Sequence, residues 1–154
     1  MITTSEEPLS SSDARAAIMH RHDELRGLLS ETMHAAERAT WSDRDLEPLR
    51  AQARHLYRAF AEHMDFEERM LPAALRDVIG QGSMLAQQVV DGHERRRATL
   101  AMALTALEPD TLPRPRVVES VRALADTLLK DLRSEERCLY TADLDAIVID
   151  GHGG

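Results

Sequence analysis

Two short stretches of the sequence place histidine and carboxylate side chains where a helix is expected to bury them. The first, HMDFEERM, begins at His63 and carries Glu67 four residues later. The second, DLRSEERCLY, repeats this frame with Asp131 and Glu135. Residues four apart lie on one face of a helix, one turn apart. Imidazole and carboxylate groups in this geometry are suited to binding iron, manganese or zinc.

Proline and glycine residues divide the chain into four segments with helical periodicity. The predicted helices span about 13–40, 46–78, 82–107 and 114–140. Ser12 or Asp13 is the expected N-cap of the first helix, and Pro72 is expected to kink the second. Long amphipathic helices with short loops predict an all-α fold, an up-down-up-down antiparallel four-helix bundle. The expected domain limits are a flexible N-terminal segment at 1–12, the bundle at 13–142 and a C-terminal tail at 143–154.

Each predicted helix has an apolar stripe that faces the bundle interior, and each stripe contains a histidine or a carboxylate. His22 interrupts the stripe of the first helix, and His93 interrupts that of the third. The expected core residues on the stripes are Leu49, Leu56, Phe60, Leu100, Leu104, Val121, Leu124 and Leu128. The polar residues set among them are therefore expected to be buried as well.

These polar residues are predicted to lie at one height in the bundle. His22 lies 17 residues before position 39, and His63 lies 17 residues after position 46, so the two are level across the first loop. Glu67 and His93 each lie 11 residues from the second loop, counted from positions 78 and 82. At about 1.5 Å per residue, all of the groups fall within roughly two turns of one level.

Burying three acids and three histidines at one level is unfavourable unless positive charge lies among them. Without compensation the free-energy cost is on the order of 10 kcal/mol, comparable with the whole stability of a domain. One or two metal ions would supply the positive charge. A metal-free alternative is a salt bridge from Arg96 or Arg97 to Asp131.

The composition excludes several other classes of function. The formal net charge is −8 over 154 residues and no basic block is present, which argues against nucleic acid or an anionic membrane surface as partner. No apolar run of about 18 residues is long enough to span a bilayer, and the segment MITTSEEPLSSS does not resemble a signal peptide. The single Cys138 excludes an internal disulfide and fits a cytoplasmic location.

The order of these residues resembles the hemerythrin-like (HHE cation-binding) domain family, whose pattern is H…HxxxE…H…HxxxE. The neighbouring residues agree: HDELRGLL begins at His22, EERMLP follows His63, GHERRR surrounds His93, and EERCLY begins at Glu135. The resemblance covers about residues 13–142. Asp131 departs from the pattern, because the family usually has a histidine there.

The resemblance implies two non-haem irons, oxo- or hydroxo-bridged, inside the bundle. The implied metal ligands are His22, His63, Glu67, His93, Asp131 and Glu135. Glu67 and Glu135 would bridge the two ions, the histidines of the first two helices would bind one ion, and His93 with Asp131 would bind the other. An aspartate is shorter than histidine and anionic, so this set favours the ferric state and weakens reversible dioxygen carriage.

A protein of this kind is expected to bind or react with a small oxidant, such as dioxygen, peroxide or nitric oxide, in oxygen or redox sensing or in detoxification. The sequence does not distinguish between a carrier, a sensor and an enzyme. The alternative is a metal-free or degenerate bundle that acts as a protein-interaction or regulatory module, with a protein partner or as a homodimer.

Several other polar residues are predicted to lie outside the site. The patterns His20-xxx-Glu24 and Glu31-xx-His34 are interpreted as solvated faces, because they lie off the apolar stripes. Two further glutamates, Glu68 and Glu136, flank the stripes and are also expected at the surface.

Overall fold

The computed structural model describes residues 9–78 and 80–151, with side chains as far as Leu139. The helices are α1 (Ser11–Trp41), α2 (Leu46–Ala74), α3 (Gly82–Leu107) and α4 (Arg114–Gly151), with a short 3-10 turn, η1 (Asp43–Asp45), before α2. No strand occurs within these ranges. The all-α fold predicted from the sequence is therefore confirmed.

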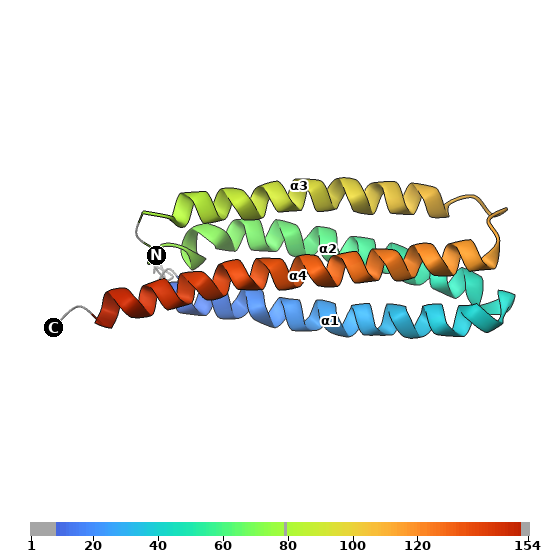
Figure 1. Ribbon diagram of the computed structural model, residues 1–154, viewed down its shortest axis with the longest axis horizontal. Helices are drawn as coiled ribbons and strands as arrows, with labels where there is room; N and C mark the ends of the chain where they lie inside the picture. The colour runs from blue at the N-terminus through green and yellow to red at the C-terminus, as the bar shows by residue number, and fades with distance from the viewer. Residues whose placement is uncertain (1–8, 79, 152–154) are drawn as a thin grey trace, which may run out of the picture.

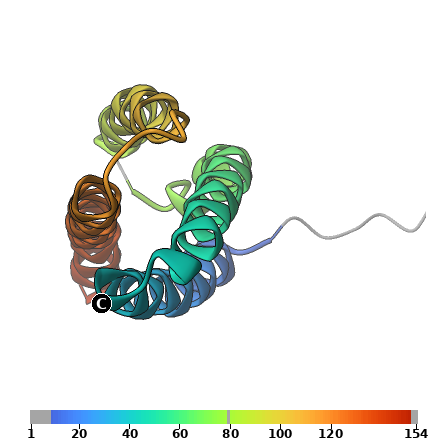
Figure 2. The same ribbon diagram turned by 90° about the vertical axis from the view of Figure 1, so that its right-hand side faces the viewer.

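The four helices form an up-down-up-down bundle in which neighbours in sequence run antiparallel (Figure 1). Viewed from the end, α1 and α3 lie at opposite corners, and each packs against both α2 and α4 (Figure 2). None of the helices in the described part of the chain has an apolar stretch that could cross a bilayer.

The apolar stripes meet in the interior and form clusters stacked along the bundle axis. One cluster includes Ile18 and Leu71, and the next includes Phe60 and Leu128. A third cluster, with Leu49 and Val117, fills the end near η1. Of the core residues predicted from the sequence, Leu49, Leu56, Phe60, Leu100, Val121, Leu124 and Leu128 are buried and Leu104 is partly buried.

The helix ends differ from the predicted ones. Ser10 is the N-cap of α1, rather than Ser12 or Asp13, because its Oγ accepts a hydrogen bond from the Asp13 N–H at 3.1 Å. Helix α2 ends at Ala74, before the predicted position 78, and Pro72 lies in its last turn.

Other boundaries fall partly outside what the structure describes. Helix α4 continues to Gly151, well beyond the predicted end near position 140, so part of the expected C-terminal tail is helical. Residues 1–8 of the expected flexible N-terminal segment lie outside the described residues.

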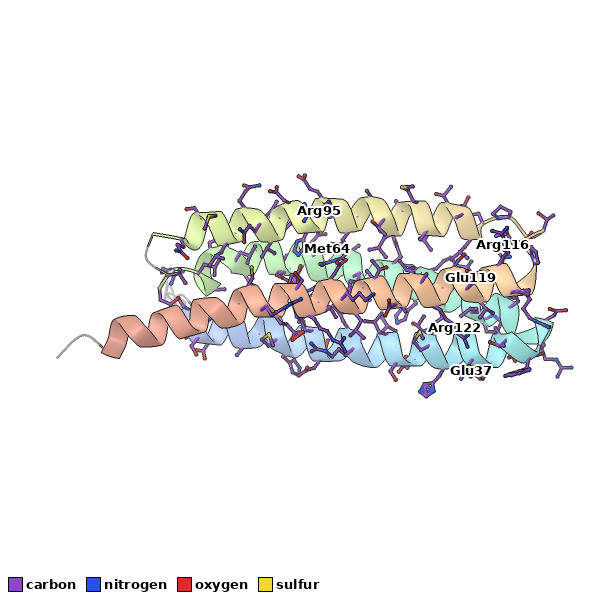
Figure 3. The ribbon with its side chains drawn as sticks, in the orientation of Figure 1. Glu37, Met64, Arg95, Arg116, Glu119 and Arg122 are labelled. Carbon is purple, nitrogen blue, oxygen red and sulfur yellow. The ribbon has the colours of Figure 1, made fainter. Side chains whose placement is uncertain are left out.

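Ion pairs join both ends of α1 to neighbouring segments of the chain. The buried Arg15 donates to the Ala74 carbonyl at 2.7 Å and to both carboxylate oxygens of Asp77, at 2.7 and 3.1 Å. Because the Arg15 guanidinium bonds to it, the pKa of Asp77 is lowered from its usual value. At the other end, Glu37 pairs with Arg122 of α4 at 2.6 Å (Figure 3).

We expect Asp77→Asn to lower the free energy of unfolding by about 1 kcal/mol at neutral pH, because Arg15 loses a charged acceptor. The folded-state pKa of Asp77 lies below the unfolded value of about 3.9. Its contribution is therefore complete above the unfolded pKa and is lost as the pH falls through the folded pKa.

Urea unfolding at a series of pH values measures this difference between wild type and variant. The exposed loop residue Asp110 provides the control, since Asp110→Asn should leave the stability unchanged. A difference for Asp77→Asn that stays constant down to the lowest pH would contradict the assignment.

Candidate metal centre

Five of the six residues predicted for the site meet in one layer of the bundle, here called the polar layer. They are His22, His63, Glu67, His93 and Glu135, and none is more than 7% exposed. The apolar cluster with Ile18 and Leu71 lies on one side of this layer, and the cluster with Phe60 and Leu128 lies on the other. The polar side chains are thus enclosed by apolar residues above and below.

Four of these residues converge on one point. One ligand atom from each of His22, His63, Glu67 and Glu135 lies within 4.8 Å of the others. Glu67 Oε2 lies 2.5 Å from His63 Nε2 and 3.3 Å from His22 Nε2. Glu135 Oε2 lies 3.4 Å from His22 Nε2. Helices α1, α2 and α4 therefore all contribute to one group of donor atoms.

Several atoms in this group are buried without a hydrogen-bond partner among the described residues. They are both ring nitrogens of His63, Nδ1 of His22, Oε1 of Glu67 and Oε2 of Glu135. Although Glu67 Oε2 is close to His63 Nε2, the two do not form a hydrogen bond. Each such atom costs about 1–3 kcal/mol. A cation bound by two imidazoles and two carboxylates would use the atoms that face the centre, so these residues fit a metal ion.

The donor atoms just described form one half of the polar layer. The other half, around His93, is arranged differently. His93 Nε2 lies 2.8 Å from Glu135 Oε1, but Asp131 does not join the converging donor atoms. Its side chain is 39% exposed and accepts a hydrogen bond from Arg96 Nε at 3.3 Å. Arg96 Nη1 also donates to Glu135 Oε1 at 2.9 Å. The sequence offered Arg96 or Arg97 as partner for Asp131, and among the described contacts it is Arg96.

A carboxylate behind His93 holds the outer side of its ring. Glu68 Oε1 lies 3.1 Å from His93 Nδ1, and Arg97 in turn donates to Glu68 at 3.0 Å. Glu68 is 29% exposed and is not among the converging donor atoms, but its contact with His93 was not predicted. A carboxylate at this position fixes the orientation and tautomer of a histidine, which leaves Nε2 directed into the centre.

A similar arrangement, with a longer contact in place of the hydrogen bond, lies behind His22. Glu136 Oε1 lies 3.5 Å from His22 Nδ1, and Arg26 forms an ion pair with Glu136. The Glu136 side chain is only 16% exposed, so its assignment to the surface was wrong, although it too is not among the converging donor atoms. The signal was present in the sequence, because both HMDFEERM and DLRSEERCLY contain a pair of adjacent glutamates.

The electrostatics of the polar layer favour positive charge. Burial alone lowers the pKa of His22, but the neighbouring carboxylates of Glu135 and Glu67 outweigh this effect and the pKa is raised. The pKa of His93 is also raised, against its burial, mainly by Glu135. Burial tends to raise the pKa of Glu135, yet the two histidines and Arg96 hold that pKa well below its usual value.

Two cavities extend from the surface to this layer. The first, about 460 Å³, lies between α3 and α4 and is lined by Arg96, Asp131 and Glu135 among others. The second, about 440 Å³, lies between α1 and α2 and is lined by His55 and His63 among others. Small molecules therefore have a route toward donor atoms on both sides of the layer.

The remaining histidine–carboxylate patterns lie away from the site, as the sequence predicted. The side chains of His20 and Glu24 are 77% and 65% exposed. Glu31 and His34 are exposed as well. Both patterns belong to solvated faces of α1.

Comparison with known proteins agrees with the residue pattern. The profile of the hemerythrin HHE cation binding domain matches residues 13–142. No curated protein and no solved structure matches the chain significantly.

We expect a divalent metal ion to raise the melting temperature of the metal-free wild type and to have no such effect on Glu67→Gln. A ligand that binds only the folded state stabilises it by about 2.7 kcal/mol at 100 times its Kd. The amide keeps the shape of Glu67 but removes the charge that attracts the cation. Thermal unfolding of chelator-treated protein, with and without ferrous iron under nitrogen, measures the shift.

Glu62→Gln is the matched control, because Glu62 is an exposed glutamate on the same helix. This control should keep the full metal-dependent shift. An unchanged shift in Glu67→Gln would show that Glu67 is not a ligand.

Proposed function

The chain belongs to the hemerythrin HHE cation-binding domain family, and from this we propose that it is a non-haem iron protein that binds or reacts with a small oxidant. Dioxygen, peroxide and nitric oxide are the candidate oxidants, and oxygen or redox sensing and detoxification are the candidate roles. The main support for this proposal is the group of histidine and carboxylate atoms that are buried in the polar layer without a hydrogen-bond partner among the described residues.

The four residues with converging ligand atoms, here called the donor group, would hold the metal. They are His22, His63, Glu67 and Glu135. When bound there, iron supplies a redox-active Lewis acid to a small ligand. The protein contributes a fixed geometry: Glu136 faces the outer nitrogen of His22, and the apolar clusters on either side close the layer along the bundle axis. Two carboxylates against two neutral imidazoles also offset the charge of a divalent ion.

The surroundings of the site support a small substrate. The cavity between α3 and α4 is lined by Glu135, so a diatomic molecule or peroxide can approach the donor group from that side. Phe60 and Leu128 close the layer toward the middle of the bundle, and both are fully buried.

The second candidate is a metal-free bundle that acts as an interaction module. The ion pairs of Arg96 with Asp131 and Glu135 favour it, because they place a permanent positive charge in the polar layer without a metal. They do not reach Glu67 or His63, whose buried atoms still lack partners among the described residues. The metal-binding proposal accounts for those atoms, and the interaction module does not.

The test is metal analysis and absorption spectroscopy of protein purified from iron-supplied cells. We expect bound iron in the wild type and a change in absorption when dioxygen, peroxide or nitric oxide is added. His63→Ala should lose both. His55→Ala should lose neither, because His55 is an exposed histidine on the same helix.

A wild type that is metal-free as purified, and spectroscopically silent after reconstitution with ferrous iron, would overturn the iron proposal and leave the interaction module.

A further inference from the structure

The polar layer repeats itself between the two halves of the chain. In α1, His22 and Arg26 are followed 71 positions later by His93 and Arg97 in α3 (93 − 22 = 97 − 26 = 71). The Glu67–Glu68 pair of α2 recurs 68 positions later as the 135–136 pair of α4 (135 − 67 = 136 − 68 = 68). The sequence thus carries these four polar residues, one histidine, one arginine and two glutamates, twice.

The contacts repeat together with the residues. Glu68 of α2 contacts the outer nitrogen of His93 and is held by Arg97. In the other half, the second glutamate of α4 faces the outer nitrogen of His22 and is held by an arginine of α1. The two halves therefore place a glutamate and an arginine alike behind one histidine each, with a hydrogen bond behind His93 and a longer contact of 3.5 Å behind His22.

Within this polar set, the repeat is broken at two positions, and these two contact each other. Arg96 of α3 corresponds to Leu25 of α1 (96 − 25 = 71), and Asp131 of α4 corresponds to His63 of α2 (131 − 63 = 68). Arg96 Nε donates to Asp131 Oδ2 at 3.3 Å. One half thus has a leucine and a histidine where the other has an ion pair.

Building on the proposed function, we propose that the protein binds one metal ion instead of two, and that the Arg96 guanidinium takes the place of the second ion. The single ion lies in the half with His22 and His63. In the half with His93, Arg96 is the built-in cation and Asp131 is its partner, not a metal ligand.

The two oxygens of Glu135 support this division. Oε2 is directed toward His22 and has no hydrogen-bond partner among the described residues, so it is available to a metal ion. Oε1 accepts from Arg96 Nη1 at 2.9 Å and also lies 2.8 Å from His93 Nε2. A carboxylate that bridges two ions needs both oxygens, and here one of them is already engaged.

The burial and charge of Arg96 also support the assignment of one metal ion to the first half and of Arg96 to the second. Its side chain is 3% exposed, so it lies inside the layer and not at the mouth of the adjacent cavity. A guanidinium stays protonated at any accessible pH. It therefore repels a second cation in this half permanently, whereas a histidine or a carboxylate would attract one.

Metal stoichiometry of four proteins tests the proposal: wild type, Asp131→His, the double variant Arg96→Leu/Asp131→His, and the control Arg95→Leu. The double variant copies Leu25 and His63 into the second half. Arg95 is exposed on α3 beside Arg96 (Figure 3) and lines the same cavity. Metal-free protein is titrated with ferrous iron under nitrogen and with Mn²⁺, and bound metal is measured after equilibrium dialysis. EPR of the Mn²⁺ samples separates isolated ions from coupled pairs.

We expect one ion per chain, with the EPR spectrum of an isolated Mn²⁺, in wild type, Asp131→His and Arg95→Leu. The double variant should bind two ions that give the spectrum of a coupled pair. Asp131→His is the decisive single change. If the second ion were absent only because aspartate is a poor ligand, this variant alone would bind two.

The outcomes separate this inference from the function on which it rests. Two ions in the wild type would overturn the inference and keep the metal-binding function. One ion in the double variant, shown to be folded by circular dichroism, would overturn the role of Arg96. No ion in the wild type would overturn the proposed function itself. If the double variant does not fold, the wild type and Asp131→His still decide the number of ions.

Discussion

The constraint on which this bundle depends is the burial of two carboxylates, Glu67 and Glu135, at one height in an apolar interior. A buried carboxylate without compensation costs several kcal/mol, a large part of the stability of an ordinary domain. Positive charge must therefore be placed beside each one. Histidines from neighbouring helices can provide part of it, because the carboxylates beside them raise the pKa values of His22 and His93 against the effect of burial.

Helical geometry explains how few residues are needed to build such a layer. Consecutive residues in a helix point about 100° apart. In each glutamate pair, the first side chain is directed into the bundle and the second is directed toward the neighbouring helix, where it reaches the outer nitrogen of a histidine. Two adjacent glutamates therefore supply both a possible metal ligand and the group that orients a histidine of the neighbouring helix. Arginines one turn beyond His22 and His93 then hold these outer glutamates in place.

The sequence predicted the parts of this arrangement that depend on periodicity alone. The four helices, the apolar stripes and the common height of the histidines follow from spacing, and the structure confirms the fold. Spacing says which face of a helix points inward, but not how far a long side chain reaches across an interface. For this reason Glu68 and Glu136 were assigned to the surface, although both contact buried histidines.

The same limit applies to the helix ends and to the arginines of α3. The N-cap at Ser10 depends on one local hydrogen bond, and several serines and an aspartate nearby are equally suitable by residue type. Arg96 and Arg97 are adjacent in sequence, and only their different directions decide that one enters the polar layer while the other holds Glu68. Spacing alone cannot separate such neighbours.

The two halves of the bundle show two physical solutions to the same electrostatic problem. In the half with His63, the buried atoms of the donor group lack partners, so that region gains stability only when a cation is bound. In the half with His93, Arg96 supplies a permanent charge, and the fold does not depend on a ligand there. A fixed cation stabilises the buried Glu135 under every condition, but it cannot exchange or change its oxidation state. On the proposed function, reactivity belongs to the half without the arginine, and the other half maintains the geometry of the Glu135 carboxylate that both share.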